Sequence, residues 1–93
     1  MFQLSIVLPS GKVFDEKIDS VAAPGLVGGL EIFSGHAPVV CALKSGKVRI
    51  KNKEGKDIRV FEIDSGILEV DATHQALILA DQIINDSQAP ATS

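Results

Sequence analysis

The spacing of the turn signals restricts the fold of this chain more than any other feature. Combinations of Gly, Pro, Asn, Asp and Ser recur about every 8–12 residues and divide the sequence into short apolar runs. Runs this short are typical of β-strands, because a stable helix needs a longer uninterrupted segment. The apolar residues also lack a convincing helical period. The sequence therefore predicts an all-β protein, either a sandwich or a barrel.

Strand patterns are clear near both ends of the chain. Residues 2–8 place an apolar side chain at every second position, as in a half-buried strand, and a turn signal follows at residues 9–12. Later, residues 67–70 and 76–80 flank a short polar segment at 71–74, which predicts a hairpin. The run at 76–80 is apolar on both faces, so we expect it to be a central strand.

The middle of the chain predicts two more elements. Residues 12–23 are expected to form one strand, irregular around 15–17. Residues 48–50 and 58–63 flank a short Gly-containing loop, which predicts a second hairpin.

Basic residues are concentrated in that second hairpin. Seven of the nine Lys and Arg residues lie between Lys44 and Arg59, and those at positions 47, 49, 51 and 53 share one face of a strand. We interpret this face as a solvated edge hairpin whose lysines block pairing with other sheets. An acidic protein surface is the alternative partner. Nucleic acid is disfavoured, because no aromatic residues interleave with the lysines and the net charge is −3.

Size and composition set further bounds. A chain of 93 residues is predicted to form one domain. The single cysteine, Cys41, excludes an internal disulfide framework and fits a reducing compartment. The apolar start lacks the basic residues of a signal peptide and breaks at Pro9. No run approaches the roughly 18 apolar residues of a membrane-spanning helix.

The most distinctive stretch covers residues 28–46, where two short apolar segments are joined by a tight turn at 34–38. Gly35 can adopt a positive φ without steric cost, and Pro38 fixes its own φ and biases the preceding residue towards extended geometry. The turn is therefore expected to present the imidazole of His36 on a rigid corner between two strands.

Few residues are candidates for chemistry. A single histidine in a turn usually forms a hydrogen bond with a neighbouring backbone group, which is the favoured interpretation of His36 over contact with a partner. His74 is interpreted as a solvated turn residue, and Cys41 as a small buried apolar residue. These three residues lack the spacing of a metal site. We predict no catalytic residues, no bound metal and no cofactor.

Residues 29–38, Gly-Leu-Glu-Ile-Phe-Ser-Gly-His-Ala-Pro, closely resemble the Gly-x-Leu-Gly-Ile-x-Pro-Gly-His-Ala-Pro-Leu signature of the epsilon subunit of F-type ATP synthases. Residues 48–50, 65–70 and 78–81 are similar to further blocks of the same family, in the same order. This resemblance implies a flattened β-sandwich of about ten short, mostly antiparallel strands. It also implies a non-catalytic central-stalk subunit that links the gamma subunit to the c-ring and couples rotation to ATP synthesis.

The resemblance also implies two sets of contact residues. The set expected to meet the polar loops of the c-ring, here called the ring set, comprises Gly28, Gly29 and Glu31. The set expected to face the gamma subunit, here called the gamma set, comprises His36, Ala37, Pro38 and Cys41. The complex would place the chain peripherally on the cytoplasmic face of a bacterial plasma membrane, with an organellar membrane as the less favoured location.

Four positions depart from the family pattern. Ser34 and Ser65 replace a usual proline and a usual glycine. Gly29 occupies the place of an acidic residue in some relatives, whereas Glu31 replaces a glycine. We hypothesise that the ring-facing carboxylate has moved two residues along the strand, which would keep it on the same face.

The end of the chain departs furthest from the family. The predicted sandwich covers residues 1–84, and residues 85–93 are expected to form a flexible polar tail. Family members commonly continue into a helical hairpin that can restrain ATP hydrolysis, and residues 85–93 do not begin such a helix. We therefore expect a short form without helix-mediated inhibition. Two alternatives stay open: a stand-alone protein- or glycan-binding module, and a small enzyme with a pocket around His36.

Overall fold

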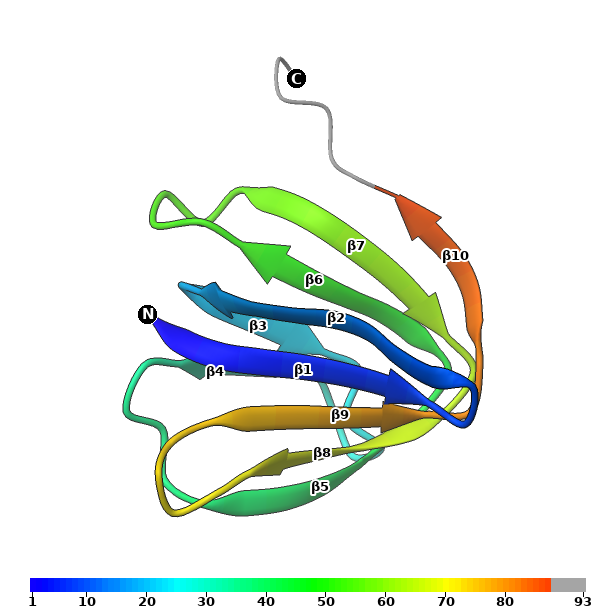
Figure 1. The fold of residues 1–93 in the computed structure, drawn as a ribbon, viewed down its shortest axis with the longest axis horizontal. Coiled ribbons are helices and arrows are strands. Elements are labelled where there is room, and N and C mark those ends of the chain that lie inside the picture. The colour runs from blue at the N-terminus through cyan, green and yellow to red at the C-terminus, as the bar shows by residue number, and fades with distance from the viewer. Residues whose placement is uncertain (88–93) are drawn as a thin grey trace.

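The computed structural model describes residues 1–87, and all the regular secondary structure in this range is β-strand. Figure 1 shows the strands in two layers, and the described residues contain ten strands in two sheets of five. This arrangement confirms the predicted β-sandwich. The principal dimensions are 34 × 28 × 26 Å, so the flattening is slight.

Sheet A has the strand order β2-β1-β9-β8-β5. Its strands are β1 (Phe2–Leu8), β2 (Gly11–Ile18), β5 (Val39–Leu43), β8 (Gly66–Val70) and β9 (Ala76–Ala80). The β1–β9 pair is parallel and the other pairs are antiparallel. The hairpin predicted at 67–80 is confirmed as β8–β9, and β9 occupies the centre of the sheet, as its two apolar faces predict.

Sheet B has the strand order β10-β7-β6-β3-β4 and is antiparallel throughout. Its strands are β3 (Ser20–Ala23), β4 (Leu30–Phe33), β6 (Gly46–Lys51), β7 (Asp57–Ile63) and β10 (Ile83–Ser87).

The core lies between the two sheets. Every second side chain of the central strands points into it. Five of these side chains have no exposed surface: Leu4, Ile50, Phe61, Leu68 and Ile78. Burying an aliphatic or aromatic side chain of this size stabilises a fold by roughly 1.5–3 kcal/mol. Among the described residues, every fully buried side-chain nitrogen or oxygen has a hydrogen-bond partner.

The single strand predicted at 12–23 is wrong, because the chain forms two strands there in different sheets. Phe14 and Ile18 point into the core from β2, whereas Val21 and Ala23 do so from β3. The spacing of three between Ile18 and Val21 shifts the alternation by one residue, so one continuous strand could not bury both. The chain changes sheets at Asp19, between the two strands.

The β6–β7 hairpin is confirmed, but its interpretation as an edge hairpin is wrong. Strand β3 pairs with β6 on one side, and β10 pairs with β7 on the other. The second pairing also extends the sandwich past residue 84, because residues 85–87 lie opposite residues 60–62 of β7. The remainder of the expected tail, residues 88–93, lies outside the described residues.

Arg59 closes the side of the sandwich between β2 and β10. Its guanidinium lies 4.7 Å from the ring centre of Phe61 and 5.8 Å from that of Phe14, and it donates two hydrogen bonds of 3.1 Å to the Asp86 carboxylate. The bonds to Asp86 raise the pKa of Arg59 above its ordinary value. This contact joins one strand of sheet A to two strands of sheet B.

Ser65, which departs from the family pattern, and its neighbour Gly66 have clear local roles. The Ser65 hydroxyl donates a 2.9 Å hydrogen bond to the Asp81 carboxylate, which ties the start of β8 to the end of β9. At the neighbouring Gly66, an added Cβ would lie 2.5 Å from the Leu79 carbonyl oxygen. The close approach of β8 and β9 therefore requires glycine at position 66 and tolerates serine at 65.

Candidate docking surfaces

Residues 34–38 form a corner that joins the edge of sheet B to the edge of sheet A. Strand β4 ends before it and β5 begins after it, so the two predicted strands exist but lie in different sheets. Gly35 has φ +79°, which confirms the predicted left-handed conformation. The His36 N–H donates to the Phe33 carbonyl over 3.2 Å and closes the turn.

The His36 imidazole is bonded within this corner. Its Nδ1 lies 2.7 Å from the Ala37 carbonyl oxygen, so Nδ1–H donates to that oxygen. The residue is half-buried. The interpretation that His36 bonds a neighbouring backbone group is confirmed.

His74 contacts the same corner, a link that sequence reasoning missed. The residue is exposed, as expected of a turn residue, and has φ +64°. Its Nδ1 lies 2.9 Å from the carbonyl oxygen of His36, 38 positions earlier in the chain. In Figure 1 the β8–β9 turn lies beside the β4–β5 connection. The contact depends on the pairing of β5 with β8, for which the sequence carries no local signal.

Cys41 lies in β5 and is half-buried rather than buried as predicted. Strand β5 is at the edge of sheet A and has β8 as its one neighbouring strand among the described residues, so its core-facing side chains are less covered than those of central strands. Within this strand, Val40 and Ala42 face outward and are exposed.

The ring set is divided between a loop and a strand. Gly28 and Gly29 lie in the connection between β3 and β4, and Glu31 lies in β4. Leu26 and Val27 in the same connection have exposed fractions of 62% and 101%, which sequence reasoning did not single out. The loop is held to β5 by a 2.9 Å hydrogen bond from the Leu26 N–H to the Ala42 carbonyl.

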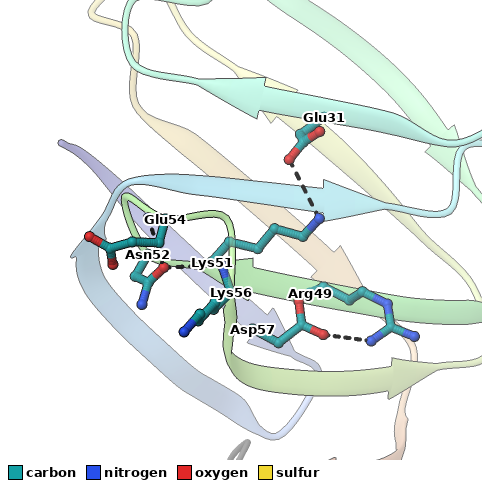
Figure 2. Close-up of polar contacts among 7 residues, drawn as sticks. All are labelled: Glu31, Arg49, Lys51, Asn52, Glu54, Lys56 and Asp57. Atoms are coloured by element: carbon teal, nitrogen blue, oxygen red, sulfur yellow. Dashed lines mark hydrogen bonds and ion pairs between the residues drawn. The ribbon is translucent and has the colours of Figure 1, made fainter.

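Glu31 lies on the outer face of sheet B and forms an internal ion pair. Its carboxylate is 3.7 Å from the Lys51 ammonium, whose side chain reaches across β3 in Figure 2. Gly29 precedes β4, so strand alternation does not place Gly29 and Glu31 on one face. An added Cβ at Gly29 would meet no atom nearer than 4.0 Å, and a side chain there has room.

The corner residues His36, Ala37 and Pro38 of the gamma set and the loop residues Gly28 and Gly29 of the ring set lie towards opposite ends of β5, with Cys41 at its middle. The corner leads into the start of β5, and the β3–β4 loop pairs with its end through the bridge between Gly25 and Leu43. Five residues of extended strand span about 17 Å. Between the sets lies a hollow of about 310 Å³, lined in part by Val27, Gly28, Val40 and Cys41. The tertiary structure therefore brings Gly28 of the ring set and Cys41 of the gamma set to the same hollow.

The outer face of sheet B, here called the charged face, holds four of its charged side chains in two internal ion pairs. It comprises Glu31, Lys47, Arg49, Lys51, Asp57 and Glu62. The Arg49 guanidinium lies 2.7 Å from the Asp57 carboxylate, and Lys51 pairs with Glu31 (Figure 2). The Asn52 side chain accepts hydrogen bonds of 3.0 Å from the backbone N–H groups of Glu54 and Lys56, which closes the adjoining loop. These pairs reduce the attraction of the face for an acidic partner.

The outer face of sheet A carries an apolar patch that crosses four strands, here called the apolar face. It comprises Val7, Val40, Ala42, Ile67, Leu77 and Leu79, and Glu69 of β8 also points outward, opposite Val40 and Leu77. One row runs from Ala42 through Ile67 and Leu79 to Val7, each residue opposite the next in the sheet register. Val40 is 69% exposed and precedes Cys41 in β5, so the apolar face and the gamma set share this strand.

Neither histidine ring nitrogen described above bonds to a carboxylate; each bonds to a backbone carbonyl. Within residues 1–87, no group of three or more His, Cys, Asp or Glu side chains is placed to hold a metal ion. In the same range, no helix is long and apolar enough to cross a membrane.

Comparison with known proteins identifies the family. The family model for the β-sandwich domain of the ATP synthase Delta/Epsilon chain matches residues 1–86. The ATP synthase epsilon chain of Chlorobium limicola is 42% identical over 80 residues, covering 86% of this chain and 90% of that protein. That of Chlorobaculum tepidum is 40% identical over 82 residues, covering 88% and 91%. The epsilon chain of Desulforamulus reducens is 43% identical over 79 residues, covering 85% of this chain and 58% of that protein.

Two solved structures share the fold. A chain in the central stalk/c-ring structure of Tetrahymena thermophila mitochondrial ATP synthase matches with a TM-score of 0.73 and 16% identity, covering 90% of this chain and 66% of that one. A chain in the OSCP/F1/c-ring structure of Euglena gracilis mitochondrial ATP synthase matches with a TM-score of 0.79 and 18% identity, covering 89% and 52%. On the strength of the family model and the bacterial relatives, this chain belongs to the ATP synthase delta/epsilon family and is of the epsilon type.

Proposed function

We propose that this chain is a rotor subunit that links the gamma subunit to the c-ring and helps couple ring rotation to ATP synthesis. The observation that carries the proposal is the match to epsilon chains over 90% and 91% of their own lengths. Epsilon chains are regulatory or structural subunits of ATP synthase and are not catalytic by themselves. They belong to a peripheral membrane complex, and we place this chain on its cytoplasmic face.

The gamma subunit would bind the gamma set and the adjoining apolar face. Large exposed apolar surfaces are uncommon on isolated monomers and mark sites that a partner covers. Val40 of the apolar face is the neighbour of Cys41 in β5, and the corner at His36 leads into that strand. The two surfaces together would supply an apolar centre with a polar rim, as stable interfaces have.

The c-ring would be met by the β3–β4 loop and by Glu31. Gly28 and Gly29 leave the backbone of this loop open to a close approach, and the exposed Leu26 and Val27 add apolar contact. Glu31 supplies a carboxylate beside the loop that remains partly exposed despite its pair with Lys51.

Binding to gamma is the first test of this function. We expect the 93-residue polypeptide to co-purify with the gamma subunit of its own organism and to restore ATP synthesis in epsilon-depleted complexes. A folded polypeptide that ignores gamma but binds members of a glycan array would overturn the proposal and favour a stand-alone binding module.

Glu31→Gln tests the ring contact separately. We expect weaker binding to the c-ring and a smaller dependence on salt, with binding to gamma unchanged, because only the ring contact uses this carboxylate. Glu54→Gln, in the exposed β6–β7 loop, is the matched control. The double variant Gly29→Asp/Glu31→Gln should recover part of the loss, since position 29 has room for a side chain. Unchanged ring binding and salt dependence in Glu31→Gln would refute the contact.

Residues 1–93 are proposed to assemble and couple without helix-mediated inhibition of ATP hydrolysis. Titration onto an epsilon-depleted complex should leave most of the hydrolysis rate intact. Strong inhibition that ATP reverses would contradict this part of the proposal.

A further inference from the structure

We propose that His74 is a positioning residue for the corner at His36, Ala37 and Pro38, and that it holds this corner in the conformation that docks. The inference rests on the proposed contact between the corner and the gamma subunit. It assigns to the β8–β9 turn a role in docking that neither the family match nor the sequence pattern assigns.

The first argument is the bonding of the corner. The His74 Nδ1–H donates to the His36 carbonyl over 2.9 Å, and the His36 Nδ1–H donates to the Ala37 carbonyl over 2.7 Å. Two successive peptide groups of the corner are therefore each held by an imidazole. The next residue is Pro38, whose ring fixes φ. Fixing the His36 carbonyl thus fixes the peptide plane from which the rest of the corner continues.

The second argument is that this bond supplies the long-range restraint at the corner. The His36 N–H bond to Phe33 and the His36 ring bond to Ala37 are both local. The bond from His74 instead ties the corner to a hairpin of sheet A, 38 positions away in the chain. The corner connects the edges of two sheets, so local bonds alone leave it free to move with either sheet.

The third argument is the rigidity of the turn that carries His74. The Asp71 carboxylate accepts hydrogen bonds from the Thr73 hydroxyl at 2.7 Å, the Thr73 N–H at 2.9 Å and the Gln75 N–H at 3.0 Å. The His74 N–H donates to the Asp71 carbonyl over 2.9 Å. These bonds, led by that from the Thr73 hydroxyl, lower the pKa of Asp71 below its ordinary value.

The backbone of His74 gives a further sign of a fixed position. Its φ of +64° lies in the left-handed region, which is unfavourable for a residue with a Cβ. Glycine would relieve this strain but could not reach the His36 carbonyl. A strained residue that is kept in place by its surroundings is a reason to look for a role of its side chain.

The experiment compares three variants of the full chain. His74→Gly keeps the backbone conformation and removes the donor. His74→Asn tolerates positive φ and keeps an N–H donor on a shorter side chain. Ala72→Ser, at the same exposed hairpin tip, is the control. The measurements are the affinity for the gamma subunit, the melting temperature, and the 15N order parameters of the His36 and Ala37 amides.

We expect His74→Gly to weaken binding to gamma about fivefold, as the loss of one hydrogen bond predicts. The order parameters at His36 and Ala37 should fall from about 0.85 to about 0.6, with the melting temperature unchanged. His74→Asn should recover part of both effects, and Ala72→Ser should match the unmodified chain. Unchanged order parameters in His74→Gly would overturn the proposal, as would weakened binding that only follows a lower melting temperature.

The free protein separates this inference from the proposed function. The order parameters are measured without gamma, so they test the positioning of the corner even if no gamma complex forms. An unmodified chain that fails to bind gamma would overturn the proposed partner, and a mobile corner in His74→Gly would still support the role of His74 in the corner.

Discussion

The two outer faces of the sandwich differ sharply, although both belong to five-stranded sheets over the same core. On the apolar face of sheet A, a row of apolar side chains crosses four strands from Ala42 to Val7. On the charged face of sheet B, the equivalent surface carries Arg49 paired with Asp57 and Lys51 paired with Glu31 (Figure 2). Exposing the charged face to water has little cost in free energy, whereas exposing the apolar face to water is unfavourable.

This difference indicates which face is better suited to a protein partner. An antiparallel sheet normally turns polar residues towards water, as sheet B does. A sheet that keeps Ile67 and Leu79 about half exposed departs from that pattern. The alternation within β8 and β9 is intact on the inner side, so the outward apolar residues are not needed for the core. They are available to a partner, and the gamma subunit is the partner proposed above.

The largest effect is expected from a matched pair of substitutions, Ile67→Glu and Ile58→Glu. Both isoleucines are 46% exposed, one on the apolar face and the other on β7 of sheet B. A carboxylate at position 67 would be buried unpaired against gamma, and we expect the affinity to fall at least about tenfold. Ile58→Glu should leave the affinity within about twofold. Equal losses in the two variants would remove the distinction between the faces.

A smaller effect is expected from Asp57→Asn on the charged face. The substitution breaks the ion pair with Arg49. The side chain of Arg49 is 42% exposed and that of Asp57 is 28% exposed. Partly exposed pairs of this kind contribute about 0.5 kcal/mol, so the free energy of unfolding in urea should fall by no more than about 1 kcal/mol. Gamma binding should be unaffected. A loss above about 2 kcal/mol would mean that this face contributes to the fold as strongly as buried residues do.

The smallest effect concerns the polar margin of sheet A, where β1 and β2 meet. Hydrogen bonds from Lys12, then Ser5 and Gln3, lower the pKa of Asp15 from 3.8 to about 2. The folded pKa lies below the unfolded one, so the stabilisation is present above about pH 4 and is lost as the pH falls towards 2. The measurement is an NMR titration of the side-chain carboxyl, with the acid limb of unfolding compared in Asp15→Asn. A midpoint near 4 would show that the three donors do not hold the carboxylate in solution.

Much of the fold could be predicted because it depends on local patterns. Alternation in residues 2–8, the two hairpins and the two-sided apolar run at 76–80 all appear as predicted. The corner around Gly35 also follows from local chemistry, since only a few residue types adopt positive φ readily. The slip of alternation between Ile18 and Val21 marks the split at Asp19, whereas the prediction places the irregularity at residues 15–17 of a single strand.

The candidate site was less predictable. The sequence places His36 in a turn, but it does not show that the turn crosses between sheets or that His74 reaches it. It shows the exposed lysines, but not that β10 and β3 flank their hairpin and that two acidic residues pair with its cations. The contact sets assigned to gamma and the c-ring remain proposals, and they are testable one at a time because the corner at His36 and the β3–β4 loop lie towards opposite ends of β5.

The sequence by itself determined the all-β class, most strand positions, the geometry of the corner and the epsilon family, because each depends on neighbouring residues or on their order. Only the tertiary structure decided which strands share a sheet, which hairpin is central, and that an apolar row crosses one outer face while ion pairs cross the other. The physical reason is that strands pair through backbone hydrogen bonds, which are the same for every sequence. Side-chain alternation fixes which residues point inward, but not which strand lies alongside.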